Sequence, residues 1–290
     1  MKRIRVAAPA KINLFLKVLG KRPDGYHDIF SWFQAVSLFD HIEIEKNGSN
    51  RIDLKILNDD SLRADHFNLV YRAAELMRER FSLKSGLDIC LEKNIPVAAG
   101  LGGGSSDAAS TIYGISRLFE LGLENSELSG LGLELGSDVP FFFSRGQAEV
   151  TGRGEIVANI DLPRDYGIIL VSPDLAISTS ESYSRLKMGL TSPKPDIKLF
   201  CCKDFKGLIK EISNINNDFE NLHLLSFPEL EKIRNVLINN GAALVRMSGS
   251  GPTIFGLYRF MPEGEGLHQS GQRDWRTFMV QPLTLPAWDR

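Results

Sequence analysis

The 290-residue sequence is poor in cysteine, and its three cysteines, Cys90, Cys201 and Cys202, are too few for a disulfide framework. Its five histidines do not pair with one another or with cysteine at zinc-ligand spacing, so we expect no structural metal. No apolar run approaches the ~18 residues of a membrane span. Lys11 and Lys17 interrupt the one stretch that could pass for a signal peptide. We therefore expect a cytoplasmic protein without membrane contact.

The sequence also lacks an excess of charge of either sign. Its 34 Lys and Arg residues nearly balance 36 Asp and Glu residues, which leaves a formal net charge of −2. Proteins that coat nucleic acid need a clear basic excess, so we expect no nucleic-acid partner. A hydrophobic fraction of 43% excludes a disordered tail. These counts leave a globular protein of one or two domains, and they do not indicate an oligomeric state.

Hydrophobic periodicity predicts an α+β protein. Alternating or continuous apolar residues and flanking turns predict strands at 3–8, 12–19, 36–38, 41–45, 52–56, 86–92, 166–171, 242–247 and 253–258. Asn47-Gly48 predicts a hairpin turn between two of these strands. Helical spacing predicts helices at 68–81, 105–119, 127–135 and 228–239, and the prolines near 192–198 predict a loop. We expect two lobes, an ATP-binding and catalytic lobe at 1–158 and a lobe at 159–290 that closes the substrate site.

The most informative segment is the glycine-rich loop from Pro96 to Ser106, between a predicted strand and a predicted helix. Glycines let the backbone approach a ligand closely, and a helix start offers unpaired N–H groups to an anion. Ser105 and Ser106 add hydroxyl donors, so we interpret the segment as a phosphate site. The alternative is a flexible loop with Ser105 as an ordinary N-cap. The glycines of the loop are Gly100, Gly102, Gly103 and Gly104.

Three further segments carry candidate functional residues. Asp138 follows a predicted helix and precedes Val-Pro and three phenylalanines, which suits either a turn or a general base. Lys11 and Asn13 share one face of the first strand and can point to one site, although Lys11 could also be a solvated edge lysine. The Gly/Ser loop at 248–252 is either a plain hairpin turn or part of a shared phosphate pocket, and we favour the pocket.

These segments, in this order, resemble the kinase superfamily of galactokinase, homoserine kinase, mevalonate kinase and phosphomevalonate kinase. They extend from residue 9 to about residue 258, and the segment 22–27 (RPDGYH) is most similar to the branch that acts on a diphosphocytidyl-linked alcohol. The resemblance implies a ribosomal protein S5-like N-terminal lobe and a C-terminal α/β-plait lobe. The matching motifs are PAKINL at 9–14, RPDGYH at 22–27, GLGGGSS at 100–106, GSDVP at 136–140, NDFE at 217–220 and SGSGP at 248–252.

The resemblance implies that the protein transfers a phosphoryl group from ATP, with Mg²⁺ carried on the nucleotide. The acceptor would be the 2-hydroxyl of a diphosphocytidyl-linked methylerythritol, in the non-mevalonate route to isoprenoid precursors. Asp138 would accept the hydroxyl proton, and Lys11 would orient Asp138 or neutralise developing charge. The implied ATP-binding residues are Asn68 and Lys93 near the adenine, together with Pro96, Gly100, Gly102, Gly103, Gly104, Ser105 and Ser106 around the phosphates.

The implied substrate-binding residues suit a cytidine. Tyr26 and Tyr183 would stack on the cytosine and His27 would bond to its edge, although Tyr183 could instead pack at a helix start. Thr179 would touch the diphosphocytidyl part. The remaining implied substrate-binding residues are Asn13, Ser248 and Gly249.

The sequence departs from the family pattern at two places, and two alternative functions stay open. Residues 262–271 are rich in glycine where the family has a helix, and residues 178–180 lack the prolines typical of that loop. The alternatives are another small-molecule kinase of the superfamily, such as mevalonate or homoserine kinase, and a non-catalytic sensor or RNA-binding relative. Tyr26 and His27 favour a nucleotide-linked substrate over the first alternative, and the joint presence of Lys11 and Asp138 disfavours the second.

Overall fold

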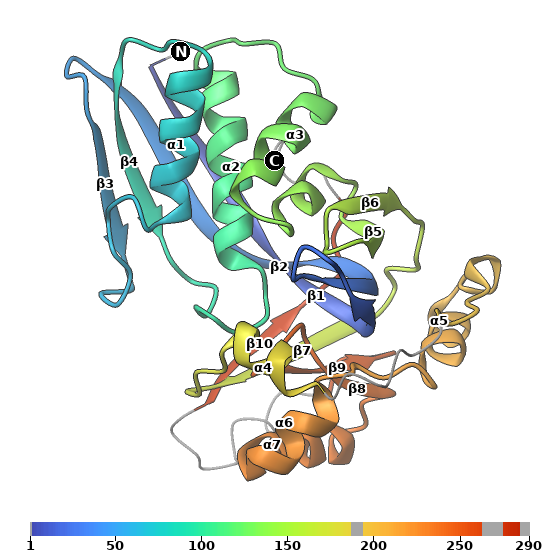
Figure 1. Cartoon of the computed structure of the whole chain (residues 1–290). Helices are drawn as coiled ribbons and strands as arrows, with labels where there is room; N and C mark the ends of the chain where they lie inside the picture. Colours follow the sequence, from blue (N-terminus) through green and yellow to red (C-terminus); the bar gives the residue numbers. More distant parts are fainter. Residues whose placement is uncertain (1, 187–193, 263–274, 285–290) are drawn as a thin grey trace.

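The computed structural model describes residues 2–186, 194–262 and 275–284, and it contains two β-sheets with helices packed against them (Figure 1). The first sheet comprises β1 (Arg3–Lys21), β2 (His27–Asn47), β3 (Ile52–Leu57), β4 (Gly86–Glu92), β5 (Gln147–Thr151) and β6 (Ile156–Asn159). The second comprises β7 (Gly167–Pro173), β8 (Leu244–Met247), β9 (Ile254–Tyr258) and β10 (Trp275–Val280). The helices are α1 (Leu69–Arg80), α2 (Gly103–Leu118), α3 (Asn125–Leu135), η1 (Val139–Phe143), α4 (Thr179–Arg185), η2 (Leu199–Cys201), α5 (Phe205–Ile212), α6 (Glu220–Ser226) and α7 (Pro228–Asn239). This mixture confirms the predicted α+β class.

The first two strands form one long antiparallel hairpin, where the sequence predicted several short strands. Strand β1 continues through Pro9 because its pairing with β2 shifts register between Pro9 and Ala10. The register shifts a second time between Asn13 and Phe15. A bulge accommodates a residue that cannot donate to the ladder. The second shift lies beside Asn13, one of the predicted site residues. Strand β2 pairs with β5 through its first half and with β4 through its second half.

The predicted hairpin at Asn47-Gly48 is wrong. Strand β3 runs parallel to β4 with Ile52 opposite Leu87, and β4 lies between β3 and β2. The segment after Gly48 turns away from β2 and is held by hydrogen bonds from the N–H of Gly86 to Ser49 O (2.7 Å). Alternation of Ile52, Leu54 and Ile56 therefore identified a strand and its faces but not its neighbour.

Helices α1, α2 and α3 cover one face of the first sheet (Figure 1). The predicted helices at 68–81, 105–119, 127–135 and 228–239 are confirmed as α1, α2, α3 and α7, with ends shifted by no more than two residues. Apolar side chains at helical spacing, such as Met77, Ile112 and Ile115, belong to one buried cluster with Ile89 of β4, and all four are almost fully buried. This layer fixes the start of α2 at the lower edge of the sheet.

The second sheet has the order β10-β7-β9-β8 and is antiparallel throughout. A buried cluster joins it to β1, with Ile12 and Leu14 packed in one group with Ile168 and Phe255. Along the sequence, the chain passes from the first sheet to the second between β6 and β7. The division into two lobes at 158/159 stays a prediction. Most of the glycine-rich segment at 262–271 and part of the loop at 192–198 lie outside the described residues. Within the described ranges, none of the helices combines the length and the apolar character needed to cross a membrane.

Candidate active site

The glycine-rich loop joins the end of β4 to α2, and its conformation requires two of its glycines. Gly100 and Gly102 have φ values of 75° and 70°, in the left-handed region that residues with a Cβ rarely adopt. A Cβ on Gly100 would lie 2.2 Å from the carbonyl oxygen of Ser248, and one on Gly102 would lie 2.9 Å from Cγ of Lys11. The loop is therefore pressed against β1 on one side and against the turn between β8 and β9 on the other.

Helix α2 begins at Gly103, two residues before the predicted start. Its N-cap, Gly102, has no side chain that could accept a hydrogen bond from the N–H groups of the first turn, and the residues from Gly102 to Ser105 line a cavity. These N–H groups and the positive end of the helix dipole favour an anion. Ser106 lies deeper: its N–H donates to Gly102 O (2.9 Å), and its buried hydroxyl has no hydrogen-bond partner among the described residues. Ser106 therefore lies apart from the other predicted phosphate-binding residues.

A cavity of about 320 Å³ opens beside this loop. Asn68, at its edge, caps α1 by accepting a hydrogen bond from the N–H of Val70 (2.9 Å). Leu62 and Phe67, which no local sequence pattern marks, give the cavity an apolar wall together with Val97 of the glycine-rich segment. Apolar walls with a few polar groups are typical of small-molecule sites. The predicted ATP-binding residues that line the cavity are Asn68, Lys93, Pro96, Gly100, Gly102, Gly103, Gly104 and Ser105.

Lys93 forms the inner wall of this cavity within a buried ionic network. Its ammonium donates to Asp40 and, at 2.9 Å, to Oδ2 of Asp107, and all three side chains are almost fully buried. Asp40 also accepts hydrogen bonds from the N–H groups of Asn94 (2.6 Å) and Ile95 (2.8 Å). Burial raises the pKa of Asp107 to about 8, against the opposing effect of Lys93. The network ties the entrance of the glycine-rich loop to the first turn of α2.

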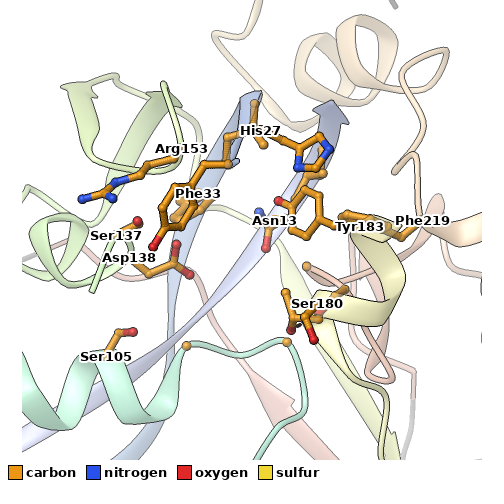
Figure 2. A pocket seen from close by; sticks show the side chains of 18 of the residues that line it. Asn13, His27, Phe33, Ser105, Ser137, Asp138, Arg153, Ser180, Tyr183 and Phe219 are labelled. Carbon is orange, nitrogen blue, oxygen red and sulfur yellow. Dashed lines mark hydrogen bonds between the residues drawn. The ribbon is translucent and has the colours of Figure 1, made fainter. Parts of the chain in front are cut away.

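A second cavity, of about 790 Å³, lies on the other side of the loop (Figure 2). Ala98, Gly100, Gly102 and Ser105 line both cavities, so the glycine-rich loop is their common wall. The predicted catalytic and substrate-binding residues that line the second cavity are Lys11, Asn13, Tyr26, His27, Asp138, Thr179, Tyr183 and Gly249.

Lys11, Asn13 and Asp138 meet at this common wall. The buried Lys11 ammonium donates to Oδ1 of Asn13 (2.7 Å) and lies 3.4 Å from Oδ2 of Asp138. It also lies 4.2 Å from the centre of the Phe33 ring, which shields it from water. Asp138 itself is one-third exposed and faces the cavity. The predicted shared strand face of Lys11 and Asn13 is confirmed, and a second hydrogen bond, from Nδ2 of Asn13 to Ser31 Oγ (3.0 Å), fixes the amide.

Aromatic side chains form the far end of the second cavity. His27 stacks on Tyr183 with ring centres 4.8 Å apart, and Tyr183 meets Phe219 edge to face (Figure 2). Tyr26 is half exposed and lies under the guanidinium of Arg153, 4.8 Å from its ring centre. Burial lowers the pKa of His27, so its imidazole is neutral near pH 7. The two predicted tyrosines thus share a cavity but stack on other partners, and their contact with a base stays a prediction.

The turn between β8 and β9 braces the glycine-rich loop. Ser248 Oγ donates to Gly100 O (2.8 Å) and accepts the N–H of Asn13 (3.3 Å), so its hydroxyl is engaged within the protein and does not line either cavity. Nδ2 of Asn217 donates to the carbonyl of Gly249 (2.7 Å), which holds the turn from below. Thr179 shares a hydrogen bond with Ser250 (2.8 Å between the hydroxyl oxygens). The two Gly/Ser loops are therefore in direct contact, and Gly249 and Ser250 line the larger cavity, while the predicted role of this turn in a phosphate pocket stays a prediction.

Two family models match the chain. The model for the N-terminal domain of GHMP kinases matches residues 68–146, and the model for the GHMP kinase C-terminal region matches residues 197–275. Solved structures with the same fold include a homoserine kinase from Cytophaga hutchinsonii, at 18% identity and a TM-score of 0.72, with 98% of this chain and 96% of that chain covered. Fold and motifs together define a GHMP kinase, an ATP-dependent kinase of small molecules.

More similar relatives narrow the family. A 4-diphosphocytidyl-2-C-methyl-D-erythritol kinase from Bacillus cereus is 42% identical over 258 residues, which is 88% of each chain. A crystal structure of 4-(cytidine 5'-diphospho)-2C-methyl-D-erythritol kinase is 30% identical, with a TM-score of 0.77 over 97% of this chain and 99% of that chain. Within the GHMP kinases, the chain belongs to the 4-diphosphocytidyl-2-C-methyl-D-erythritol kinase family.

Proposed function

We propose that the protein transfers the γ-phosphoryl group of ATP to the 2-hydroxyl of 4-diphosphocytidyl-2-C-methyl-D-erythritol, in the non-mevalonate route to isoprenoid precursors. The main observation in support of this proposal is that the two cavities share one wall, the glycine-rich loop. The cavity beside the start of α2 suits the phosphates of ATP, and the cavity with the aromatic end suits a cytidine-linked alcohol. Lys11 and Asp138 lie at the wall, where phosphoryl donor and acceptor would meet.

Asp138 acts in this proposal as the base that accepts the proton of the acceptor hydroxyl. Its side chain lines the larger cavity, and its Oδ2 lies 3.4 Å from the Lys11 ammonium, within reach of an acceptor hydroxyl placed at the common wall. Lys11 stabilises the negative charge that develops on the hydroxyl oxygen, because its ammonium is buried and its position is fixed by Asn13. Phosphoryl transfer depends mainly on such positioning and charge stabilisation.

ATP phosphates are held in this proposal by the N–H groups at residues 102–105. Among the described residues, no cluster of three or more His, Cys, Asp or Glu side chains could hold a metal ion. Mg²⁺ keeps several waters and commonly binds through phosphate oxygens, so these residues fit an ion that arrives with the nucleotide. When bound, the ion neutralises phosphate charge. The protein then has only to align the phosphates with the acceptor hydroxyl.

Replacing Tyr26 with alanine is expected to raise the KM for the cytidine substrate roughly tenfold or more, because stacking on a base contributes about 1–3 kcal/mol. The KM for ATP should stay near the wild-type value, since Tyr26 lines only the larger cavity. Steady-state kinetics with each substrate varied in turn measures the two constants. Tyr26→Phe keeps the ring and serves as the matched control. Equal increases in both KM values would contradict the stacking role.

A substrate panel tests the proposed function itself. With ATP and Mg²⁺, we expect turnover of the diphosphocytidyl alcohol and a kcat/KM at least about 10³-fold lower for mevalonate and homoserine, because neither fills the aromatic end of the cavity. Phosphorus NMR of the product locates the new phosphate on the 2-hydroxyl. Comparable activity on mevalonate or homoserine, or a phosphate on another hydroxyl, would overturn the assignment.

A further inference from the structure

The turn between β5 and β6, residues 152–155, lies against the active site although no motif marks it. Gly154 is buried, and a Cβ at this position would lie 3.1 Å from Oδ1 of Asp138 and 3.3 Å from Cβ of Ser137. Its φ of +123° is one that residues with a side chain rarely adopt. The backbone of Gly154 therefore lies so close to the Asp138 carboxylate that a side chain at this position would crowd it.

Among the residues that the structure describes, few other contacts fix that carboxylate. Lys11 approaches Oδ2 at 3.4 Å, which is longer than a strong hydrogen bond, and Asp138 makes no side-chain capping bond to η1. The side chain is also one-third exposed. Its Oδ1 side faces Gly154 and its Oδ2 side faces Lys11, so the turn and the lysine confine it from two directions.

The β5–β6 turn is itself held firmly. The carbonyl of Gly152 accepts a hydrogen bond from the N–H of Ile29 in β2 (2.7 Å), and the N–H of Gly154 donates to Thr151 (3.2 Å). The carboxylate of Glu155 folds back over Gly152 and accepts the N–H of Arg153 (2.6 Å). Arg153 in turn covers the ring of Tyr26, and Figure 2 shows it on the same side of the cavity as Ser137 and Asp138.

We propose that the β5–β6 turn is a positioning element for Asp138, in which Gly154 provides the surface that sets the carboxylate at the common wall of the two cavities. The proposal rests on the proposed role of Asp138 as the base. Gly154 touches neither substrate in this account, because it does not line either cavity. It acts through Asp138, so its replacement changes the chemical step and not the binding of ATP or the alcohol.

The principal test is Gly154→Ala. A methyl group at this position must displace the carboxylate, and a misplacement of about 1 Å can lower a rate about 10²-fold. We expect kcat to fall roughly 10- to 100-fold, with both KM values within about threefold of wild type. A kcat within about twofold of wild type, or a KM increase that accounts for the loss, would overturn the proposal.

Gly122→Ala is a control for the introduction of a methyl group at a glycine with a positive φ. Gly122 also has a positive φ, +66°, but a Cβ there would meet nothing within 4 Å. We expect it to lower the melting temperature slightly and to leave kcat unchanged. An equal loss of kcat in both variants would assign the effect to strain and overturn the proposal.

Glu155 provides a second test that adds no atoms near Asp138. Glu155→Ala removes the side chain that braces the turn, whereas Glu155→Gln can still accept the N–H of Arg153. We expect the alanine variant to lower kcat without changing KM and the glutamine variant to restore kcat. A wild-type kcat in Glu155→Ala would contradict the proposal.

Asp138→Asn distinguishes a failure of the positioning proposal from a failure of the base assignment. If Asp138→Asn is inactive and both turn variants are fully active, only the positioning proposal fails; if Asp138→Asn is active, the base assignment fails.

Discussion

Replacing Asp138 with asparagine is expected to lower kcat about 10³-fold, because general base catalysis contributes typically 10²- to 10⁴-fold. Asparagine has nearly the volume of aspartate but cannot accept the hydroxyl proton at neutral pH. The Kd for ATP should stay close to the wild-type value, since Asp138 lines the larger cavity and not the cavity beside α2. Single-turnover kinetics and calorimetric titration with ATP measure the two quantities, and Asp138→Ala should give the same separation.

Asp174→Asn is a suitable control for this experiment, because Asp174 is exposed and lies outside both cavities. It should keep wild-type kcat. If Asp138→Asn loses ATP affinity while its single-turnover rate is retained, the residue binds nucleotide and is not the base. If only the chemical step is slower, Asp138 acts in the reaction itself. Lys11→Met is then the next variant to measure, because Lys11 is the charged partner of Asp138 at the common wall.

The predictable part of the fold is the part set by local patterns. Helix α7 and strand β4 have the predicted residue ranges because each has a clear apolar period and a turn residue at its end. Strand β3 shows the limit: its alternation is clear, but its parallel partner β4 follows after helix α1 and could not be read from neighbouring residues. Short helices α4 and α6 were missed because seven residues give barely two turns of periodicity.

The candidate site, like the fold, has residues that local motifs predict and residues that they do not. Motif residues such as Lys11 and Asp138 could be predicted, because the chemistry of each motif is carried by a few adjacent side chains. Arg153 and Gly154 could not, since the β5–β6 turn reaches the site only through the pairing of β5 with β2. A signal did exist in the sequence: two glycines flank Arg153 between two short alternating segments. Such a turn indicates close backbone approach but not what is approached.

Replacing Lys93 with methionine is expected to destabilise the protein by about 3–5 kcal/mol, because it leaves the buried carboxyl groups of Asp40 and Asp107 without the cation that they share. Asp40 and Asp107 both contact the Lys93 ammonium, and their side chains are only 0% and 4% exposed. Urea unfolding measures the change in the free energy of unfolding. Arg80→Met, which breaks the half-exposed pair with Glu134, is the control and should cost no more than about 1 kcal/mol.

The effect of Lys93→Met should depend on pH. Burial already raises the pKa of Asp107 to about 8, and loss of the lysine raises it further. The folded variant therefore binds a proton that the unfolded chain, with a pKa of about 3.9, releases. The wild-type fold holds the same proton below pH 8, so the loss of stability should be nearly constant between about pH 4 and 8 and should increase as the pH rises above 8. Asp107→Asn in the same chain should recover part of the loss at neutral pH. A loss that stays unchanged above pH 8 would contradict this account.

The same network connects stability to the nucleotide cavity. Asp40 holds the N–H groups of Asn94 and Ile95 at the entrance of the glycine-rich loop, and Asp107 lies in the first turns of α2. A Cβ on Gly103 would lie 3.2 Å from the Lys93 ammonium, so the charged group is packed directly beneath the start of the helix. Lys93→Met should therefore weaken ATP binding in addition to stability. If Lys93→Met/Asp107→Asn regains stability but not ATP affinity, Lys93 contacts the nucleotide directly; recovery of both assigns it to support of the loop.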